Sequence, residues 1–231
     1  MIQDITNNIC GLKENIAEAA KTCDRNPDDI TLIAVSKKKS IHDIKQALIA
    51  GQTHFGESYV QELASKVQDF NNPAIIWHFI GHLQKNKAKF LVGYVDLIHT
   101  IDRISLAQTI NQLAENKNIV QKGLIQVKIS QEESKYGILP EEVPTLLTEL
   151  NSMNNINIMG LMLIGTWTED TTIQQKEFHA LRKLRDDLNA KNLYRNELKE
   201  LSMGMSHDYA LAIKEGATMI RIGTDIFGER V

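Results

Sequence analysis

Three consecutive lysines, Lys37, Lys38 and Lys39, follow an apolar run in the segment LIAVSKKKS. A lysine in apolar surroundings has its charged form disfavoured, and its amine can then attack an aldehyde to form a Schiff base. Because side chains alternate along a strand, Lys37 would point to the same side as Ile33 and Val35. Lys38 would then face a layer of helices, and Lys39 belongs to the loop. The alternative is that the three lysines form a solvated turn.

The last third of the chain has features of an anion-binding site. The segment SMGMS, residues 202–206, follows an apolar run and precedes a helix expected to begin at about Asp208, which Ser206 could cap. The segment RIGT, residues 221–224, ends another apolar run. Glycine lets a ligand approach backbone N–H groups, hydroxyls add donors, and helix N-termini bind phosphate. Ordinary turns also favour Gly and Ser, so that alternative stays open.

Arg221 needs an explanation of its own. By alternation it shares one side of its strand with Met219 and Gly223. An arginine buried at that position must meet an anion or another acceptor. A phosphate, a buried carboxylate or a heterocyclic nitrogen would serve, and a structural ion pair is the alternative.

The histidines His78 and His82 lie in the segment WHFIGH. Gly81 between them and the apolar run before them do not suit two ligands on one helical face. No third ligand lies nearby and the HExxH motif is absent, so no metal site is expected. The pattern favours hydrogen-bonded core or loop histidines. The run QKNK, residues 84–87, is either a set of pocket donors or, as the pattern favours, a solvated helix end.

Eight short apolar runs must position these residues, and a stretch of helical period separates most neighbours. The runs cover residues 31–36, 53–56, 75–80, 97–101, 124–129, 156–164, 201–203 and 219–222, after a first helix over about 2–23. Core packing is the interpretation of the methionines Met153, Met159, Met162, Met203 and Met205.

This alternation implies parallel strands with right-handed crossovers. Eight repeats in 231 residues favour a single (β/α)₈ barrel of the TIM type with an extra N-terminal helix. An open doubly wound sheet is the alternative, and the short runs THFG and LSM are the weakest strands. In such a barrel the site lies at the C-terminal ends of the strands, with phosphate near the seventh and eighth.

Composition excludes several classes of protein. Hydrophobic residues make up 42% and charged residues 24% of the chain, which argues against disorder. The net charge of -3 argues against a basic nucleic-acid surface. No apolar run approaches the roughly 20 residues of a membrane span. Asp4, Lys13 and Glu14 interrupt the start where a secretory signal would be apolar, so we expect a cytoplasmic protein.

The two cysteines, Cys10 and Cys23, are expected to be free thiols. If both lie on the first helix, their separation of 13 residues corresponds to about 20 Å along the axis. A disulfide needs Cα atoms within about 7 Å. Neither cysteine has a CxxC neighbour, so we expect no zinc or redox role.

The chain resembles the YggS/PROSC family of pyridoxal phosphate homeostasis proteins, which is similar to the barrel domain of alanine racemase. The resemblance rests on the order and spacing of eight segments, LIAVSK, HFGESYVQE, WHFIGHLQKNK, HTIDR, ESKYG, GLMLI, LSMGMSHD and RIGTDIFGER. They run across nearly the whole chain. The resemblance implies one domain over residues 1–231 that binds pyridoxal 5′-phosphate (PLP).

The resemblance also implies roles for particular residues. Lys37 would form the internal aldimine with PLP, and Arg221 would face the pyridine nitrogen. The phosphate would be held by Ser206, Gly223 and Thr224, with Ser202 assisting. Ser58 and His78 complete the predicted cofactor-binding set, and no catalytic residue is assigned. A permanent cation beside the ring nitrogen disfavours its protonation and so makes the ring a weaker electron sink.

Two positions depart from the family pattern. The family usually reads GEN where this chain reads Gly56-Glu57-Ser58, and Ser58 is shorter and offers one hydroxyl in place of an amide. Asp225 stands where the family often has a small residue. An acid beside the phosphate would be unfavourable unless it points away, as alternation from Thr224 would allow.

The resemblance implies a protein that holds, buffers or delivers PLP in vitamin B6 homeostasis, without evident turnover. One alternative is a PLP-dependent amino-acid racemase, and another is an aldolase-like barrel that traps a phosphorylated metabolite on Lys37. Racemisation needs an acid or base on each face of the carbon, and alanine racemase takes one, a tyrosine, from an extra β domain. The barrel leaves only residues 226–231 after the eighth run. We expect a monomer, PLP-dependent enzymes as partners, and neither nucleic acid nor membrane.

Overall fold

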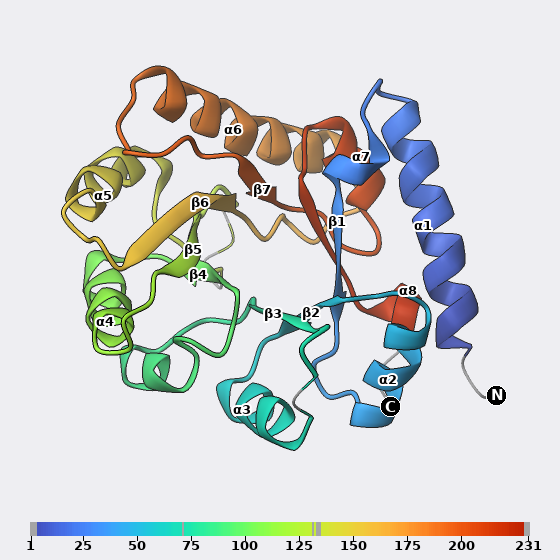
Figure 1. The fold of residues 1–231 in the computed structure, drawn as a ribbon. Helices are drawn as coiled ribbons and strands as arrows, with labels where there is room; N and C mark the ends of the chain where they lie inside the picture. Colours follow the sequence, from blue (N-terminus) through green and yellow to red (C-terminus); the bar gives the residue numbers. More distant parts are fainter. Residues whose placement is uncertain (1–3, 71, 131, 133–134, 229–231) are drawn as a thin grey trace.

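The strands close into a parallel barrel (Figure 1). In the computed structural model, which describes residues 4–70, 72–130, 132 and 135–228, each strand pairs in parallel with the next, and β8 pairs with β1. The strands are β1 (Thr31–Val35), β2 (His54–Glu57), β3 (Ile76–Phe79), β4 (Leu97–Ile101), β5 (Gln121–Gln126), β6 (Ile156–Met162), β7 (Glu200–Ser202) and β8 (Met219–Ile222). The predicted (β/α)₈ barrel is confirmed, and the β1–β8 pairing excludes the open sheet.

Helices surround the barrel as an outer layer (Figure 1). They are α1 (Ile5–Lys21), α2 (Ile41–Ile49), α3 (Val60–Asp69), α4 (Ile104–Glu115), α5 (Val143–Leu150), α6 (Thr171–Ala190), α7 (Tyr209–Lys214) and α8 (Thr224–Phe227), with 3₁₀ turns η1 (Pro27–Asp29), η2 (Lys85–Phe90) and η3 (Pro140–Glu142). The helix expected between β3 and β4 is the 3₁₀ helix η2, and its exposed start at Gln84, Lys85 and Asn86 is a solvated helix end. Within the described part of the chain, no helix has both the length and the apolar character of a membrane span.

The first helix, α1, packs along the outside of the barrel beside α2, α7 and α8 (Figure 1). Its buried side chains recur with helical spacing at Ile5, Ile9, Leu12, Ile16 and Ala20. Asp4 caps the helix by accepting the N–H of Asn7 at 3.1 Å. The helix ends at Lys21, earlier than predicted, and Asp24 turns the chain with a left-handed φ of 55°. Residue 2, the predicted start, lies outside the described residues.

The fifth strand begins earlier than its apolar run predicted. The run 124–129 gave no sign of Gln121, which is buried and opens β5. The Gln121 side-chain amide donates to the carbonyl of Val95 at 3.0 Å, so its polar group is satisfied. The short runs THFG and LSM do form strands, β2 and β7, each shifted by one residue.

Apolar side chains pack on both sides of the barrel wall. Ile33, Leu97, Leu124, Met162 and Met219 pack in the interior, and a larger cluster lies between barrel and helices. Met153 and Met203 belong to the larger cluster, as the core-packing interpretation predicted. This packing supports the strands up to their C-terminal ends, where the interior opens.

Candidate functional site

A cavity of about 470 Å³ opens at the C-terminal ends of the strands, a volume typical of small-molecule sites. We call it the mouth cavity. Its apolar lining is Val35, Ile80, Met162, Ile164, Trp167 and Met205, and its polar lining is Lys37, Lys39, Ser58, Ser206, His207, Arg221, Thr224 and Asp225, with Gly223 and Gly228. Met162 and Met205 therefore border a cavity as well as the core, which the core-packing interpretation did not predict.

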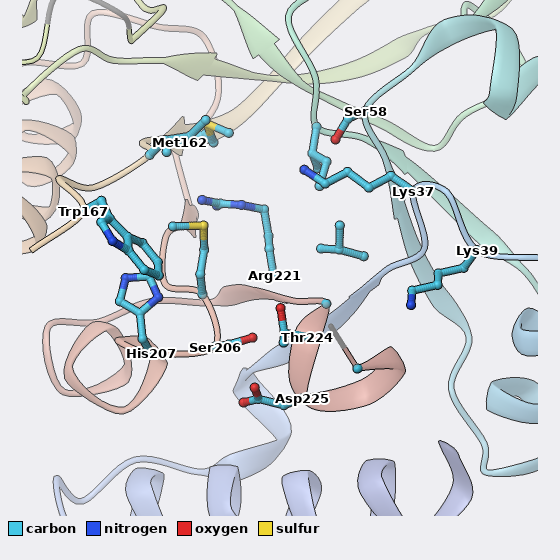
Figure 2. Close-up of a pocket in the computed structure, with 16 residues that line it drawn as sticks. Lys37, Lys39, Ser58, Met162, Trp167, Ser206, His207, Arg221, Thr224 and Asp225 are labelled. Carbon is cyan, nitrogen blue, oxygen red and sulfur yellow. The ribbon is translucent and has the colours of Figure 1, made fainter. Parts of the chain in front are cut away.

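Lys37 enters the mouth cavity from the end of β1 (Figure 2). Ile33 lies in the barrel interior, Val35 borders the cavity, and Lys37 follows on the same side. Lys38 is exposed, adopts a left-handed φ of 61°, and donates its backbone N–H to Glu62 at 2.5 Å. The strand ends at Val35 and the chain turns, and Lys38 faces the start of α3, with its Nζ 6.0 Å from the centre of the Tyr59 ring, as alternation predicted.

Lys39 also borders the mouth cavity, although it was expected only as a loop residue. Its Nζ donates to the backbone carbonyl of Phe227 at 2.8 Å. The contact ties the loop after β1 to the end of α8. Nothing in the sequence distinguished this lysine from Lys38, because the loop geometry decides which of the two turns inward.

Two hydroxyls face each other across one end of the cavity (Figure 2). Thr224 begins α8, and Ser206 lies in the turn before α7. Gly223 precedes α8, where the first N–H groups of a helix have no partner inside it. Ser206 does not cap α7, because that helix begins at Tyr209. The N-cap position is Asp208, whose carboxylate accepts the N–H of Met205 in the preceding turn at 2.5 Å.

Arg221 is buried and borders the mouth cavity from below. Its Nη1 donates to Oγ of Ser202 at 2.7 Å, and its Nη2 donates to the carbonyl of Leu163 at 2.8 Å. None of the ion pairs among the described residues includes Arg221, so the structural ion-pair alternative finds no support. Burial lowers the pKa of Arg221 to about 10, which leaves it cationic at neutral pH.

His78 and Ser202 do not line the mouth cavity; they lie beneath it in the barrel. Ser202 contacts Arg221 and, at 2.9 Å, Nδ1 of His99. His99 Nε2 lies 2.9 Å from His78 Nδ1, and His78 Nε2 lies 2.9 Å from His54 Nδ1. His78 and Ser202 therefore contact buried side chains below the mouth cavity, and their contact with a cofactor stays a prediction.

Sequence reasoning missed His54 and His99 as members of this line. Both occupy strands, β2 and β4, on either side of His78 on β3. Alternation along each strand indicates the side to which its histidine points, so the direction of each single histidine could have been predicted from the sequence. Neighbouring strands bring three such histidines together only in the register of the closed barrel, in which His78 pairs with Gly56 and Leu97.

In the segment Gly56-Glu57-Ser58, the side chains of Glu57 and Ser58 point in different directions. Ser58 lines the mouth cavity near Lys37 (Figure 2). Glu57 is buried outside the barrel, where it pairs with Lys66 at 2.7 Å and accepts the Ser36 hydroxyl at 2.6 Å. Desolvation raises the pKa of Glu57, and Lys66 opposes this shift. The glutamate is thus part of the packing between strand and helix, and the serine is part of the cavity.

Asp225 lines the cavity and is exposed, so it does not take the outward direction that alternation from Thr224 would have allowed. The strand ends at Ile222, and Asp225 belongs to the first turn of α8, where strand alternation no longer applies. Its carboxylate lies near Thr224 and Ser206 (Figure 2). The hydroxyl end of the cavity therefore has an acidic neighbour.

Trp167 and His207 form an aromatic pair at the edge of the cavity, with ring centroids 4.2 Å apart (Figure 2). Trp167 is 75% exposed, unusually high for a large aromatic side chain. Sequence reasoning missed both residues, because neither lies in a strand. Within the described residues, no group of three or more His, Cys, Asp or Glu side chains is arranged to hold a metal ion.

Comparison with known families and proteins gives consistent results over the whole chain. Residues 8–231 match the family described as alanine racemase, N-terminal domain. The pyridoxal phosphate homeostasis protein of Pasteurella multocida is 40% identical over 228 residues, 98% of this chain and 97% of that protein. The protein of the same name from Aquifex aeolicus is 41% identical over 217 residues, 94% of each chain.

Solved structures resemble the fold at two levels. The structure of PipY from Synechococcus elongatus with PLP bound has a TM-score of 0.82 and 37% identity, and it covers 92% of this chain and 100% of that one. An alanine racemase of Clostridium difficile has a TM-score of 0.72 and 16% identity, over 98% of this chain and 57% of that one. The racemase likeness shows the fold alone.

Proposed function

Because the chain belongs to the family of pyridoxal phosphate homeostasis proteins, we propose that it binds PLP in the mouth cavity and contributes to vitamin B6 homeostasis. The observation that carries the proposal is the buried cation Arg221, which borders the cavity and is held by neutral groups. A cation placed in this way is available to an acceptor on a ligand.

The residues of the cavity fit the three polar features of PLP. PLP has an aldehyde, a phosphate and a ring nitrogen. Lys37 supplies a primary amine, Ser206 and Thr224 supply hydroxyl donors at a helix N-terminus, and Arg221 supplies a guanidinium on a third side of the cavity. The apolar lining leaves room for the ring.

Lys37 is the proposed attachment point. When PLP is bound, its aldehyde supplies a carbonyl that can condense with the Lys37 amine, forming a C=N bond and releasing water. Ser58 lies beside Lys37 in the cavity, and we propose that its hydroxyl faces this end of the cofactor. We propose that Ser206, Gly223 and Thr224 hold the phosphate at the opposite end.

We infer that the protein holds PLP without turnover. A cation beside the ring nitrogen disfavours its protonation, and an unprotonated ring stabilises a carbanion poorly. The relatives are named as homeostasis proteins. Purified protein should therefore racemise alanine negligibly. Substantial racemisation that is lost in Lys37→Ala would contradict this inference and favour a racemase.

The decisive experiment is reduction of the loaded protein with borohydride. We expect an absorbance band of a lysine-bound cofactor, and after reduction the cofactor mass on the peptide that contains Lys37. Lys37→Ala should lose both signals, whereas the exposed neighbour Lys38→Ala should keep them. Cofactor mass on Lys38, or none at all, would refute the assignment. Trapping of a sugar phosphate on Lys37 in place of PLP would favour an aldolase.

Delivery of PLP to PLP-dependent enzymes is the second part of the proposal, and the open mouth of the barrel supports it. The loaded protein should activate an apo PLP enzyme faster than the same concentration of free PLP. Equal or slower activation would contradict delivery. We propose a cytoplasmic monomer, in keeping with the free cysteines Cys10 and Cys23.

A further inference from the structure

A line of hydrogen-bonding side chains crosses the barrel from Arg221 to its floor, the end opposite the mouth. At that floor a second cavity of about 450 Å³ is lined by His54 together with Lys13, Asp28, Thr31 and Gln52. We call it the floor cavity. The line thus joins two cavities at opposite ends of the barrel through Ser202, His99 and His78.

The direction of every hydrogen bond in this line follows from Arg221. A guanidinium only donates, so Ser202 Oγ accepts from Nη1 at 2.7 Å. Ser202 and His99 are both fully buried. The single hydroxyl proton of Ser202 is satisfied when it points to His99 Nδ1 at 2.9 Å. If His99 donated instead, this proton would lose its partner in the line inside the core.

The same reasoning fixes the tautomers of the three histidines. A neutral imidazole has one donor and one acceptor nitrogen. Because His99 accepts at Nδ1, it donates from Nε2 to His78 Nδ1. His78 then donates from Nε2 to His54 Nδ1, which leaves the proton of His54 on Nε2. All four bonds run in one direction, away from Arg221.

The surroundings keep the histidines neutral, as this arrangement requires. Desolvation lowers the pKa of His78 to about 3 and the pKa of His99 well below its usual value. Desolvation also lowers the pKa of the half-buried His54, against the opposing effect of Asp96. Lys122 pairs with Asp96 at 3.1 Å, which reduces the attraction of Asp96 for a proton on His54.

We propose that Ser202, His99, His78 and His54 form a one-way relay that holds the Arg221 guanidinium in place for the ring nitrogen of PLP. The four are positioning residues, because they lie below the cavity and act through Arg221. The relay itself follows from the structure, whereas its effect on the cofactor rests on the proposed function.

The first test measures the tautomers without any cofactor. Nitrogen-15 spectra of histidine side chains in the wild-type protein should show protonated Nε2 and unprotonated Nδ1 at all three relay histidines. Ser202→Ala removes the group that sets the direction, so it should change the signals of His99 and also of the more distant His78. A mixture of tautomers in the wild type, or unchanged signals in Ser202→Ala, would overturn the relay.

The second test uses the loaded protein. Ser202→Ala should raise the Kd for PLP roughly tenfold, because a hydrogen bond to a charged group is lost, and should shift the cofactor band. Ser202→Thr keeps the hydroxyl and should restore both. His42→Gln, an exposed histidine on α2, is the matched control and should change neither.

The two proposals fail in different ways. Wild-type protein that takes up no PLP would contradict the proposed function, and the relay would then be judged by the histidine signals alone. Wild-type protein that binds PLP, with Ser202→Ala identical to it in Kd and band position, would refute the positioning role. Thermal unfolding of each variant checks that a raised Kd does not reflect a loss of fold.

Discussion

Arg221 borders the mouth cavity and is hydrogen-bonded to groups in the barrel below it. Two of its N–H groups are committed to neutral acceptors, Ser202 and the Leu163 carbonyl, so its orientation is fixed from inside the barrel. A buried arginine with neutral partners retains its full charge toward a ligand. At the scale of the residue, its expected effect is on the proton of the ring nitrogen.

Arg221→Gln tests that effect. A glutamine amide can still donate to Ser202, but it removes the positive charge beside the ring nitrogen. The nitrogen of bound PLP should then take up its proton at a pH about 1 to 3 higher than in the wild type. The measurement is a pH titration of the cofactor band. Arg221→Lys, which keeps the charge, should titrate like the wild type, and equal titration of the glutamine variant would contradict the role.

Asp225 is the residue most poorly suited to a phosphate at the hydroxyl end. It is exposed, so its repulsion of an anion is weakened by solvent. Asp225→Asn should lower the Kd for PLP by up to about fivefold, and by less at high salt. Fluorescence titration measures the change. Glu149→Gln, an exposed acid on α5, is the control and should leave the Kd unchanged. Weaker binding by the asparagine variant would contradict the prediction.

The strands β3 and β4 carry the buried histidines His78 and His99, which make the stability of the fold depend on pH. Between about pH 6.5 and pH 3, His78 is protonated in the unfolded chain but stays neutral in the folded protein. Unfolded chain therefore binds more protons, and the free energy of unfolding falls as pH falls. From pH 7 to pH 5, His78 alone should cost about 2 kcal/mol.

Urea unfolding at pH 7, 6 and 5 measures this loss, and His99 should add to it in the same direction. The raised pKa of Glu57 acts in the opposite sense, because an acid protonated in the fold is favoured by lower pH. His42→Gln should show the wild-type slope. A free energy of unfolding that does not change between pH 7 and pH 5 would contradict the prediction.

The elements themselves were largely predictable from the sequence. Apolar runs located all eight strands, including the short β2 and β7, because strands buried on both faces leave an apolar signal. Elements built on polar residues were not seen. Gln121 begins β5, where its side chain is held by hydrogen bonds, and the 3₁₀ helix η2 stands where an α-helix was expected. The spacing of hydrophobic residues indicates neither feature.

The site was predictable as far as alternation within one strand reaches. This reasoning directed Lys37 and Arg221 to one side of their strands, and both border the mouth cavity. It does not apply beyond the end of a strand, as at Asp225, and it does not show which strands lie in register, as at His54 and His99. The binding roles of the cavity residues stay predictions.

On the scale of the whole molecule, α1 covers the part of the barrel near β1 and β8. It packs on α2, α7 and α8, and Asn8 donates to the Ile226 carbonyl of α8 at 3.0 Å. Ile9→Ala removes a fully buried side chain from this contact and should lower the free energy of unfolding by about 2–5 kcal/mol.

Chemical denaturation measures this change, with Cys10→Ala as the exposed neighbour on the same helix. The control should stay within about 0.5 kcal/mol of the wild type. The loaded Ile9→Ala protein should keep the wild-type cofactor band, because α1 does not line the mouth cavity. A loss of stability as small as that of the control would show that α1 is loosely attached.

The one-way order of hydrogen bonds also limits how this barrel can evolve. Replacing Ser202, His99 or His78 singly by a residue that cannot both donate and accept a hydrogen bond leaves a donor or an acceptor without a partner in the core, and selection against unstable folds would remove such a change. A different set of hydrogen-bonded side chains can therefore evolve at these positions only if neighbouring members change together. We expect descendants of this chain to inherit the four relay residues and Arg221 as a set, or to have exchanged several of them at once.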